Sequence, residues 1–195
     1  MWSVAENRQR RRRAPGTVRI IGGRWRSRRL AFPEAGGLRP SPDRIRVTLF
    51  NWLMPVLTGA RCLDLFAGSG CLGLEALSRG AIEAVLVENN PAVVTALRAN
   101  IAELKACGAL VVEADAMAFL AAPATPFDIV FVDPPFARGL VLSVLPALTA
   151  GWLKPGAFVY VESAVDDEPF VPPGLKVVRD KTAGAVRYRL LRSGP

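Results

Sequence analysis

Hydrophobic and polar positions follow two different patterns along this chain. From residue 61 onward, short unbroken apolar runs such as RCLDLFA and DIVFVD alternate with longer segments that have helical spacing. Apolar strands that alternate with helices are typical of a mostly parallel sheet with helices on both faces. Residues 175–192 contain two β-like runs around KTAGA, which predict a closing antiparallel hairpin. The pattern predicts an α/β fold with a seven-stranded, Rossmann-like sheet.

The chain before residue 61 follows the other pattern. Residues 1–16 have no apolar periodicity and predict a disordered, arginine-rich tail. Residues 17–40 contain the runs TVRIIGG and RRLAF, which predict a small basic β-hairpin followed by a loop. The segment SPDRIRVTLFNWL predicts an amphipathic helix with Ser41 as its cap. We therefore expect the main domain to span residues 41–195.

Charge is distributed unevenly between these parts. The net charge is +8, but residues 1–46 hold 13 arginines and three acidic residues, a net of +10, whereas residues 47–195 have a net of −2. Guanidinium groups bind phosphates in a forked geometry and stack on bases, so this block favours a polyanionic partner. A solvated tail or a targeting signal is the alternative for residues 8–13.

Composition excludes several kinds of protein. The chain has no histidine, which excludes histidine triads, histidine metal ligands and imidazole bases. Cys62, Cys71 and Cys107 have no metal-ligand spacing and are expected to be reduced and buried. No apolar run reaches the roughly 20 residues of a membrane span, and the N-terminus does not resemble a signal peptide. We expect a soluble, cytoplasmic protein with no metal and no membrane partner.

A glycine-rich loop follows the first strand of the expected sheet. DLFAGSGCLG places Gly68, Gly70 and Gly73 in the spacing G-x-G-x-x-G before a helix. Such glycines let the backbone turn tightly and approach a ligand at the helix N-terminus. Glu88 ends the next strand, where Rossmann proteins use an acid to hold a ribose diol. Alone, this pattern fits a dinucleotide oxidoreductase, or a tight turn without a ligand.

Asp64 changes the cofactor that the loop predicts. This acid lies inside an apolar strand, four residues before Gly68, and burying it is costly unless a group donates to it. A dinucleotide pyrophosphate would be repelled there, whereas the ammonium and sulfonium of S-adenosylmethionine would be attracted. Asp64 therefore favours S-adenosylmethionine, and an acid that caps backbone amides is the alternative.

The segment DIVFVDPPF carries the second candidate site. Asp133 follows the fourth strand, at the edge of the sheet that faces a ligand. Two prolines fix the backbone there, so the Pro134 carbonyl has a set direction, and Phe136 offers an aromatic ring. Two acceptors that draw an exocyclic amine toward tetrahedral geometry expose its lone pair to an electrophilic methyl group. A strand-terminating turn is the alternative.

The chain resembles the bacterial 16S rRNA guanine-N2 methyltransferase family in DLFAGSGCLGLEALSRGA, VFVDPPF and RPSPDRIRVTLFNWL. Residues in VRIIGGRWRSRRL and GWLKPGAFVYVES are also similar, so the resemblance covers residues 17–192. Members of this family are class I enzymes that use S-adenosylmethionine. The resemblance implies a monomer that methylates N2 of a guanine in 16S rRNA, either naked or within a small-subunit particle.

The resemblance also implies roles for individual residues. The cofactor would be held by Asp64, Gly68, Gly70, Glu88, Asn89, Asp115 and Ala116. The target guanine would be held by Asp133, Pro134 and Phe136. We expect the RNA to be contacted by Arg19, Arg24, Trp25, Arg26, Arg28, Arg29, Arg44 and Arg46. The chain departs from the family pattern at Val47, where glutamate is usual, and at Asn89, where an acid is common.

Two other functions share parts of this pattern. A DNA adenine-N6 methyltransferase uses the same amine chemistry, but such enzymes usually carry a sizeable target-recognition region, and no stretch here is long enough. An RNA-binding assembly factor with a vestigial site is the other alternative. The acids Asp64, Glu88, Asp115 and Asp133 argue against it, because a vestigial site need not retain them.

Overall fold

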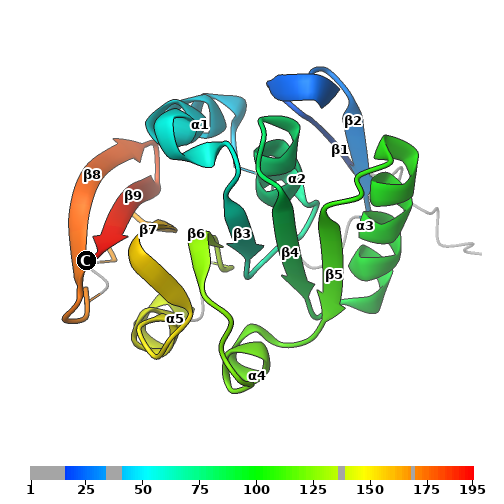
Figure 1. Ribbon diagram of the computed structural model, residues 1–195. Helices are drawn as coiled ribbons and strands as arrows, with labels where there is room; N and C mark the ends of the chain where they lie inside the picture. The colour runs from blue at the N-terminus through cyan, green and yellow to red at the C-terminus, as the bar shows by residue number, and fades with distance from the viewer. Residues whose placement is uncertain (1–15, 34–40, 136–138, 168–169) are drawn as a thin grey trace, which may run out of the picture.

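The computed structural model describes residues 16–33, 41–135, 139–167 and 170–195. Seven strands form one sheet in the order β5-β4-β3-β6-β7-β9-β8 (Figure 1). The strands are β3 (Arg61–Asp64), β4 (Glu83–Glu88), β5 (Ala109–Glu113), β6 (Phe127–Val132), β7 (Leu153–Ala164), β8 (Leu175–Ala183) and β9 (Val186–Ser193). Neighbours among β3 to β7 are parallel, and β9 is antiparallel to β7 and β8. The mostly parallel sheet with a closing antiparallel hairpin is confirmed.

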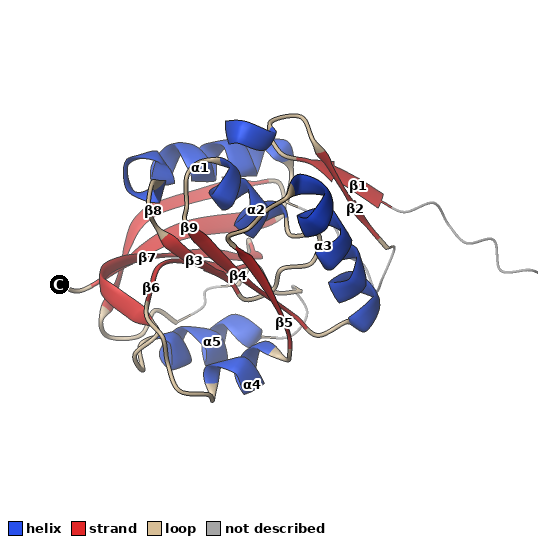
Figure 2. Cartoon of the chain, turned by 45° about the vertical axis from the view of Figure 1, so that its right-hand side comes forward, coloured by secondary structure: helices blue, strands red, loops and turns tan. Residues whose placement is uncertain are grey.

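Helices cover both faces of this sheet (Figure 2). One face carries α1 (Asp43–Leu57), α2 (Cys71–Ser78) and α3 (Pro91–Leu104), and the other carries α4 (Ala116–Leu120) and α5 (Leu140–Leu148). Each face has its own cluster of buried apolar side chains. Burial on both faces explains why the strands read as unbroken apolar runs.

The N-terminal hairpin consists of β1 (Gly16–Arg19) and β2 (Arg29–Phe32), joined through the short 3-10 helix η1 (Gly23–Trp25). Its apolar side chains belong to the same core cluster as those of α2 and α3. These buried residues are Val18, Ile20, Leu30 and Phe32. The hairpin therefore packs on the helical layer of the main domain and not on the sheet. The expected tail lies outside the described residues, apart from Gly16.

Local side chains begin two helices as expected from capping chemistry. The Asn90 side chain accepts hydrogen bonds from Ala92 N and Val93 N at the start of α3, and Asp115 does the same for α4. The predicted cap of α1 is wrong, because the cap position is Pro42 and no side chain caps this helix. The hydroxyl of Ser41 is used elsewhere. The expectation of three buried cysteines is also wrong, since Cys107 is exposed.

Candidate active site

Five acidic side chains lie along one edge of the sheet. Asp64 ends β3, Glu88 ends β4, and Asp115 follows β5. Asp133 follows β6, and Glu162 lies near the end of β7. Since these five strands are parallel neighbours, their carboxyl ends meet at a common edge, which is where α/β proteins bind ligands. The chain order also reverses direction between β3 and β6, which places the switch point of the sheet between Asp64 and Asp133.

Two of these acids hold the glycine-rich loop. Glu88 Oε2 accepts a hydrogen bond from Gly68 N at 3.0 Å, and Asp64 Oδ2 accepts one from Gly73 N at 3.0 Å. Gly70 precedes α2 with a φ of 77°, a conformation that strongly favours glycine. The loop is therefore fixed on both sides by carboxylates that also face the ligand edge.

Asp64 keeps one oxygen without a partner. Its Oδ1 is buried and forms no hydrogen bond with any residue that the structure describes. Burial raises the pKa of Asp64 to about 7, although the backbone N–H groups of Gly73 and Phe66 act in the opposite direction. A cationic ligand would satisfy this oxygen and favour the carboxylate. The site thus fits the ammonium group of S-adenosylmethionine better than a phosphate.

The buried acid predicts a pH dependence of stability. Asp64 has an ordinary pKa of 3.8 when unfolded and one near 7 when folded, so folding takes up a proton between these values. Its contribution is complete below the unfolded pKa and is lost as pH rises through the folded one, by roughly 1.4 kcal/mol per pH unit. Denaturant unfolding of the ligand-free protein at pH 5, 6 and 7 measures this slope.

Asp64→Asn should remove one group's share of that slope. Asp128, at the other end of the sheet, is the matched control, because its pKa is lowered by the hydrogen bond from Lys154 against the effect of burial. Asp128 is therefore ionised in both states over this window, and Asp128→Asn should leave the slope unchanged. An equal slope in Asp64→Asn and wild type would contradict the assignment.

The remaining cofactor candidates lie at helix starts. Glu88 Oε1 also accepts from Asn90 N at 2.8 Å, which joins the end of β4 to α3. Asp115 is exposed, and its Oδ1 accepts from Met117 N and Ala118 N. Asn89 is exposed and Ala116 is buried. The structure thus brings the residues named for the cofactor to adjacent strand ends, with Glu88 and Asp115 already accepting backbone hydrogen bonds.

Asp133 belongs to a group of hydrogen-bonded side chains that the sequence did not reveal. The Ser41 hydroxyl lies 3.0 Å from Asp133 Oδ2 and 2.5 Å from Glu162 Oε1, and the Tyr160 hydroxyl donates to the same Glu162 oxygen at 2.7 Å. Burial raises the pKa of Asp133 well above its usual range, and the Glu162 charge raises it further. Pro134 is buried beside it, whereas Phe136 lies outside the described residues.

Most of the arginines proposed for RNA are on the surface. Arg24, Arg26, Arg29 and Arg44 are exposed, and the Arg24 guanidinium lies 4.1 Å from the centre of the half-buried Trp25 ring. Two further exposed arginines form ion pairs, Arg19 with Asp43 and Arg28 with Glu103. The exposed charges gather on the hairpin and on the start of α1.

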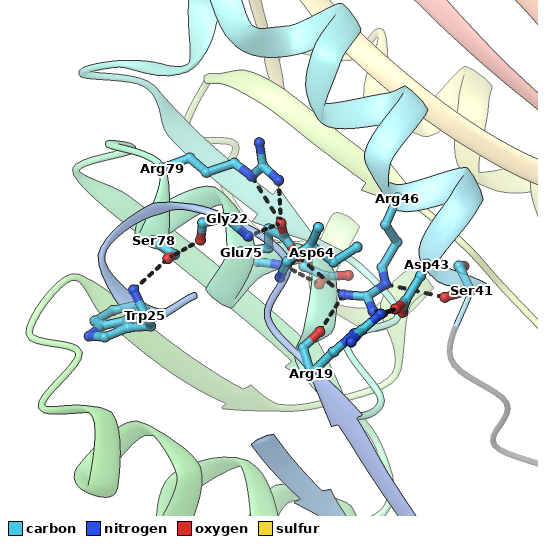
Figure 3. A network of polar contacts seen from close by, with 12 residues as sticks. Arg19, Gly22, Trp25, Ser41, Asp43, Arg46, Asp64, Glu75, Ser78 and Arg79 are labelled. Atoms are coloured by element: carbon cyan, nitrogen blue, oxygen red, sulfur yellow. Dashed lines mark hydrogen bonds and ion pairs between the residues drawn. The ribbon is translucent and has the colours of Figure 1, made fainter. Parts of the chain in front are cut away.

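The expectation that Arg46 contacts RNA is wrong. Its side chain is fully buried, and its guanidinium contacts Glu75 Oε2 at 3.1 Å and Asp43 Oδ1 at 2.6 Å (Figure 3). It also donates to the backbone carbonyls of Ser41 and Arg19. With its donors committed inside the protein, Arg46 cannot contact an RNA phosphate in this conformation. Its role is to join the hairpin, α1 and α2.

Glu75 is the centre of this buried network (Figure 3). It lies on α2 and accepts hydrogen bonds from Ile21 N and Gly22 N of the hairpin, as well as from Arg46 and Arg79. Next to it, a Cβ atom on Gly23 would lie 1.9 Å from the Ser78 carbonyl oxygen, so only glycine allows this approach. The hairpin is therefore fixed to the helix that follows the glycine loop.

Comparison with known proteins identifies the family. Residues 18–192 match the family model of Conserved hypothetical protein 95. The chain is 55% identical over 177 residues to ribosomal RNA small subunit methyltransferase D of Escherichia coli strain K12, covering 90% of this chain and 89% of that protein. The chain belongs to this methyltransferase family. Its counterpart of the same name in Haemophilus influenzae is 43% identical, covering 92% of this chain and 96% of that protein.

Solved structures agree with this family assignment. The Escherichia coli protein yhhF has a TM-score of 0.86 with 53% identity, over 92% of this chain and 99% of that one. A Thermus thermophilus 16S rRNA N2 G1207 methyltransferase, solved with AdoMet and guanosine, has a TM-score of 0.66 with 24% identity, over 93% of this chain and 50% of that one. The latter likeness concerns the fold, and the expected class I methyltransferase fold is confirmed.

Val47, one of the two departures from the methyltransferase family pattern, lies near the buried network around Arg46 in the sequence of α1. Val47 stands where the family usually has glutamate, and 40% of its surface is exposed on α1. The buried network around Arg46 is complete without a carboxylate at that position, because Asp43 and Glu75 both pair with the guanidinium. The loss of the usual glutamate therefore leaves no buried charge uncompensated there.

Among the residues that the structure describes, no three cysteine, aspartate or glutamate side chains gather closely enough to hold a metal ion. None of the described helices has the length and apolar character needed to cross a bilayer.

Proposed function

We propose that this protein transfers a methyl group from S-adenosylmethionine to the exocyclic N2 amine of a guanine in 16S rRNA. The observation that carries the proposal is the placement of two carboxylates on adjacent strands. Asp64, with its unpartnered buried oxygen, lies beside the glycine loop, and Asp133 with Pro134 lies one strand away. The name of the 55% identical Escherichia coli relative supports small-subunit rRNA as the substrate.

The proposed cofactor contacts follow the edge of the sheet. Asp64, with Gly68 and Gly70, would hold the methionine end, where its unpaired oxygen attracts the ammonium group. Glu88 would hold the ribose hydroxyls from the end of the adjacent strand β4. The adenine end would be contacted by Asn89, Asp115 and Ala116. When bound, S-adenosylmethionine supplies an electrophilic methyl group on a sulfonium.

The protein's own contribution to the reaction is mainly positioning. The Asp133 carboxylate and the Pro134 carbonyl would accept the two N–H bonds of the target amine and turn its lone pair toward the methyl group. Phe136 is proposed to stack on the base, and the guanine must leave any helical stack to reach this edge. Because β6 and β3 are paired neighbours, a base held at Asp133 and Pro134 would lie one strand away from the cofactor acid Asp64.

RNA docking is proposed for the hairpin. Replacing Arg24, Arg26 and Arg29 together with glutamine should weaken binding of 16S rRNA and make its salt dependence shallower by roughly 2 in log–log slope, for three lost phosphate contacts. Methyl transfer should fall with it, because these charges lie on an element fixed to α2. Filter binding and turnover over a salt series measure both effects.

The matched control replaces three exposed arginines outside the hairpin with glutamine. These are Arg98, Arg179 and Arg192. The change in net charge is the same, so a general electrostatic effect would weaken binding equally in both triple variants. An equal loss would contradict docking by the hairpin.

The function itself is tested by isotope transfer from labelled S-adenosylmethionine. The acceptors are naked 16S rRNA, assembled small subunits and duplex DNA, and the labelled nucleoside is then identified by digestion and chromatography. We expect N2-methylguanosine from rRNA or small subunits. N6-methyladenine from DNA would identify an adenine methyltransferase instead. RNA binding without transfer to any acceptor would identify an assembly factor.

A further inference from the structure

The strand register places a second carboxylate directly beside Asp133. Val132 of β6 pairs with Val161 of β7, so the next residues, Asp133 and Glu162, lie side by side on neighbouring strands. Both contact the hydroxyl of Ser41, which approaches from the segment before α1, at 3.0 Å and 2.5 Å. The arrangement is a carboxyl, a hydroxyl and a second carboxyl in continuous hydrogen-bond contact.

The number of protons available decides which group donates each hydrogen bond in this arrangement. A serine hydroxyl has one proton to donate, and its shorter contact is with Glu162, which also accepts from Tyr160. The contact between Ser41 and Asp133 then becomes a hydrogen bond when Asp133 carries a proton and donates it to the hydroxyl oxygen. Burial raises the pKa of Glu162, but two donors oppose this effect and favour its carboxylate, whereas Asp133 has one hydrogen-bond contact and lies at the ligand edge.

We propose that Ser41 and Glu162 form a proton relay behind Asp133. The proposal rests on the function above, in which Asp133 accepts an N–H of the target amine. When the N–C bond forms and the methyl donor's S–C bond breaks, the amine nitrogen becomes positively charged and must lose a proton. Asp133 takes that proton, Ser41 accepts it from Asp133 while giving its own to Glu162, and the nitrogen becomes neutral.

The relay returns to its starting state by the reverse route. Glu162 is only 2% exposed, so it has little direct contact with water. After the product leaves, the proton passes back through Ser41 to Asp133, which is half-buried and lies at the carboxyl edge of the sheet. Asp133 would be the catalytic residue, and Ser41 and Glu162 act through it as positioning and proton-accepting groups.

Other ionisable groups around the pair come from five elements. They are Asp64 of β3, Cys71 of α2, Arg46 of α1, Tyr160 of β7 and Tyr188 of β9. Burial raises the pKa of Cys71 to about 12 and that of Tyr160 well above its usual value, so both are neutral near pH 7. Arg46 directs its guanidinium to Glu75 and Asp43. The groups that titrate near neutrality at this edge are therefore carboxyls.

The first test measures single-turnover methyl transfer to 16S rRNA in the full-length protein. Glu162→Gln keeps the shape and can still accept from Ser41 and Tyr160, but it cannot take up a proton. Ser41→Ala removes the bridging hydroxyl, and Ser41→Thr restores one. We expect the rate to fall about 10- to 100-fold in Glu162→Gln and Ser41→Ala, and to recover in Ser41→Thr, with unchanged KM for RNA and unchanged cofactor affinity.

Ser163→Ala is the matched control for this series. Ser163 is also buried, lies next to Glu162, and donates to the Ala164 carbonyl and not to Asp133. Its rate should stay at the wild-type value. Rates within twofold of wild type in either Glu162→Gln or Ser41→Ala would overturn the relay.

The second test is the pH profile of the same rate, because a merely structural role would not move it. Glu162 raises the pKa of Asp133 by its charge, so removing that charge should shift the acidic inflection of Glu162→Gln to lower pH. Carbon NMR of the carboxyl groups in the ligand-free protein should show the same downward shift for Asp133. An unmoved inflection or an unmoved Asp133 titration would overturn the proposal.

These outcomes separate the relay from the proposed function. If the wild-type protein methylates no guanine in rRNA, the function has failed, and the carboxyl titration still reports whether Asp133 and Glu162 are coupled. If the wild-type protein is active and the variants are equally active, the relay alone has failed.

Discussion

Replacing Asp133 with alanine should abolish methyl transfer while leaving the affinity for S-adenosylmethionine almost unchanged. The carboxylate is proposed to accept an N–H of the target amine, and it directly follows β6, one strand away from the cofactor acid Asp64 on β3. Loss of one preorganised polar group of this kind typically lowers turnover by roughly 10²–10³. Isothermal titration with the cofactor and single-turnover transfer to rRNA separate binding from chemistry.

The same variant should not be destabilised, which excludes unfolding as the cause of lost activity. Asp133 is held close to Glu162, and this like charge raises its pKa, so removing it relieves an unfavourable interaction. Asp128 lies at the start of the same strand, and Asp128→Asn serves as the control that should keep full turnover. Near-normal turnover in Asp133→Ala would contradict its assignment as the amine acceptor.

The fold could be predicted from local pattern because each signal has a direct physical cause. Strands buried on both faces must be apolar throughout, and helices between them must have one apolar face. Two acids at strand ends followed from the same reasoning, since Glu88 and Asp133 each close an apolar run. Asp64 lies inside the apolar run RCLDLFA, and the structure shows that it ends β3. Parallel strands bring such ends to one edge whatever lies between them along the chain.

Arg46 shows where charge misled the interpretation. Its place in an arginine-rich block predicts RNA contact, but it lies three and four residues before Leu49 and Phe50, on the buried face of α1. Helical spacing therefore predicts the burial of Arg46. Its buried partner Glu75 could not be predicted from local pattern, because it lies 29 residues away. A buried arginine requires such a partner.

Ser41 and Glu162 were missed for a related reason. Ser41 precedes a helix and has the side chain of a typical cap, but the Pro42 backbone starts the helix and frees the hydroxyl. Glu162 lies beside Asp133 only because of the register between β6 and β7. The paired residues Val132 and Val161 are 29 positions apart, and neither strand's sequence predicts that register. Long-range pairing is the information that local pattern lacks.

The largest effect on stability is expected at Glu75. This carboxylate is fully buried and receives the Arg46 guanidinium, the Arg79 guanidinium and two backbone N–H groups of the hairpin. Glu75→Gln removes the negative charge and leaves buried Arg46 with only Asp43 as a carboxylate partner. Breaking a buried pair in this way costs about 3–5 kcal/mol, because the buried Arg46 charge then keeps only the partly exposed Asp43 as a compensating carboxylate. Denaturant unfolding measures the loss.

Two comparisons test whether the buried charge is the cause. Glu83→Gln removes a partly exposed ion pair with Arg61 and should cost at most about 1 kcal/mol. Adding Arg46→Met to Glu75→Gln removes the buried positive charge that has lost Glu75 and should recover part of the lost stability. Hairpin amide exchange should accelerate in Glu75→Gln, because Ile21 N and Gly22 N lose a charged acceptor. If Glu75→Gln and Glu83→Gln cost the same, the hairpin is not held through Glu75, and the rigid presentation of its arginines to RNA must have another origin.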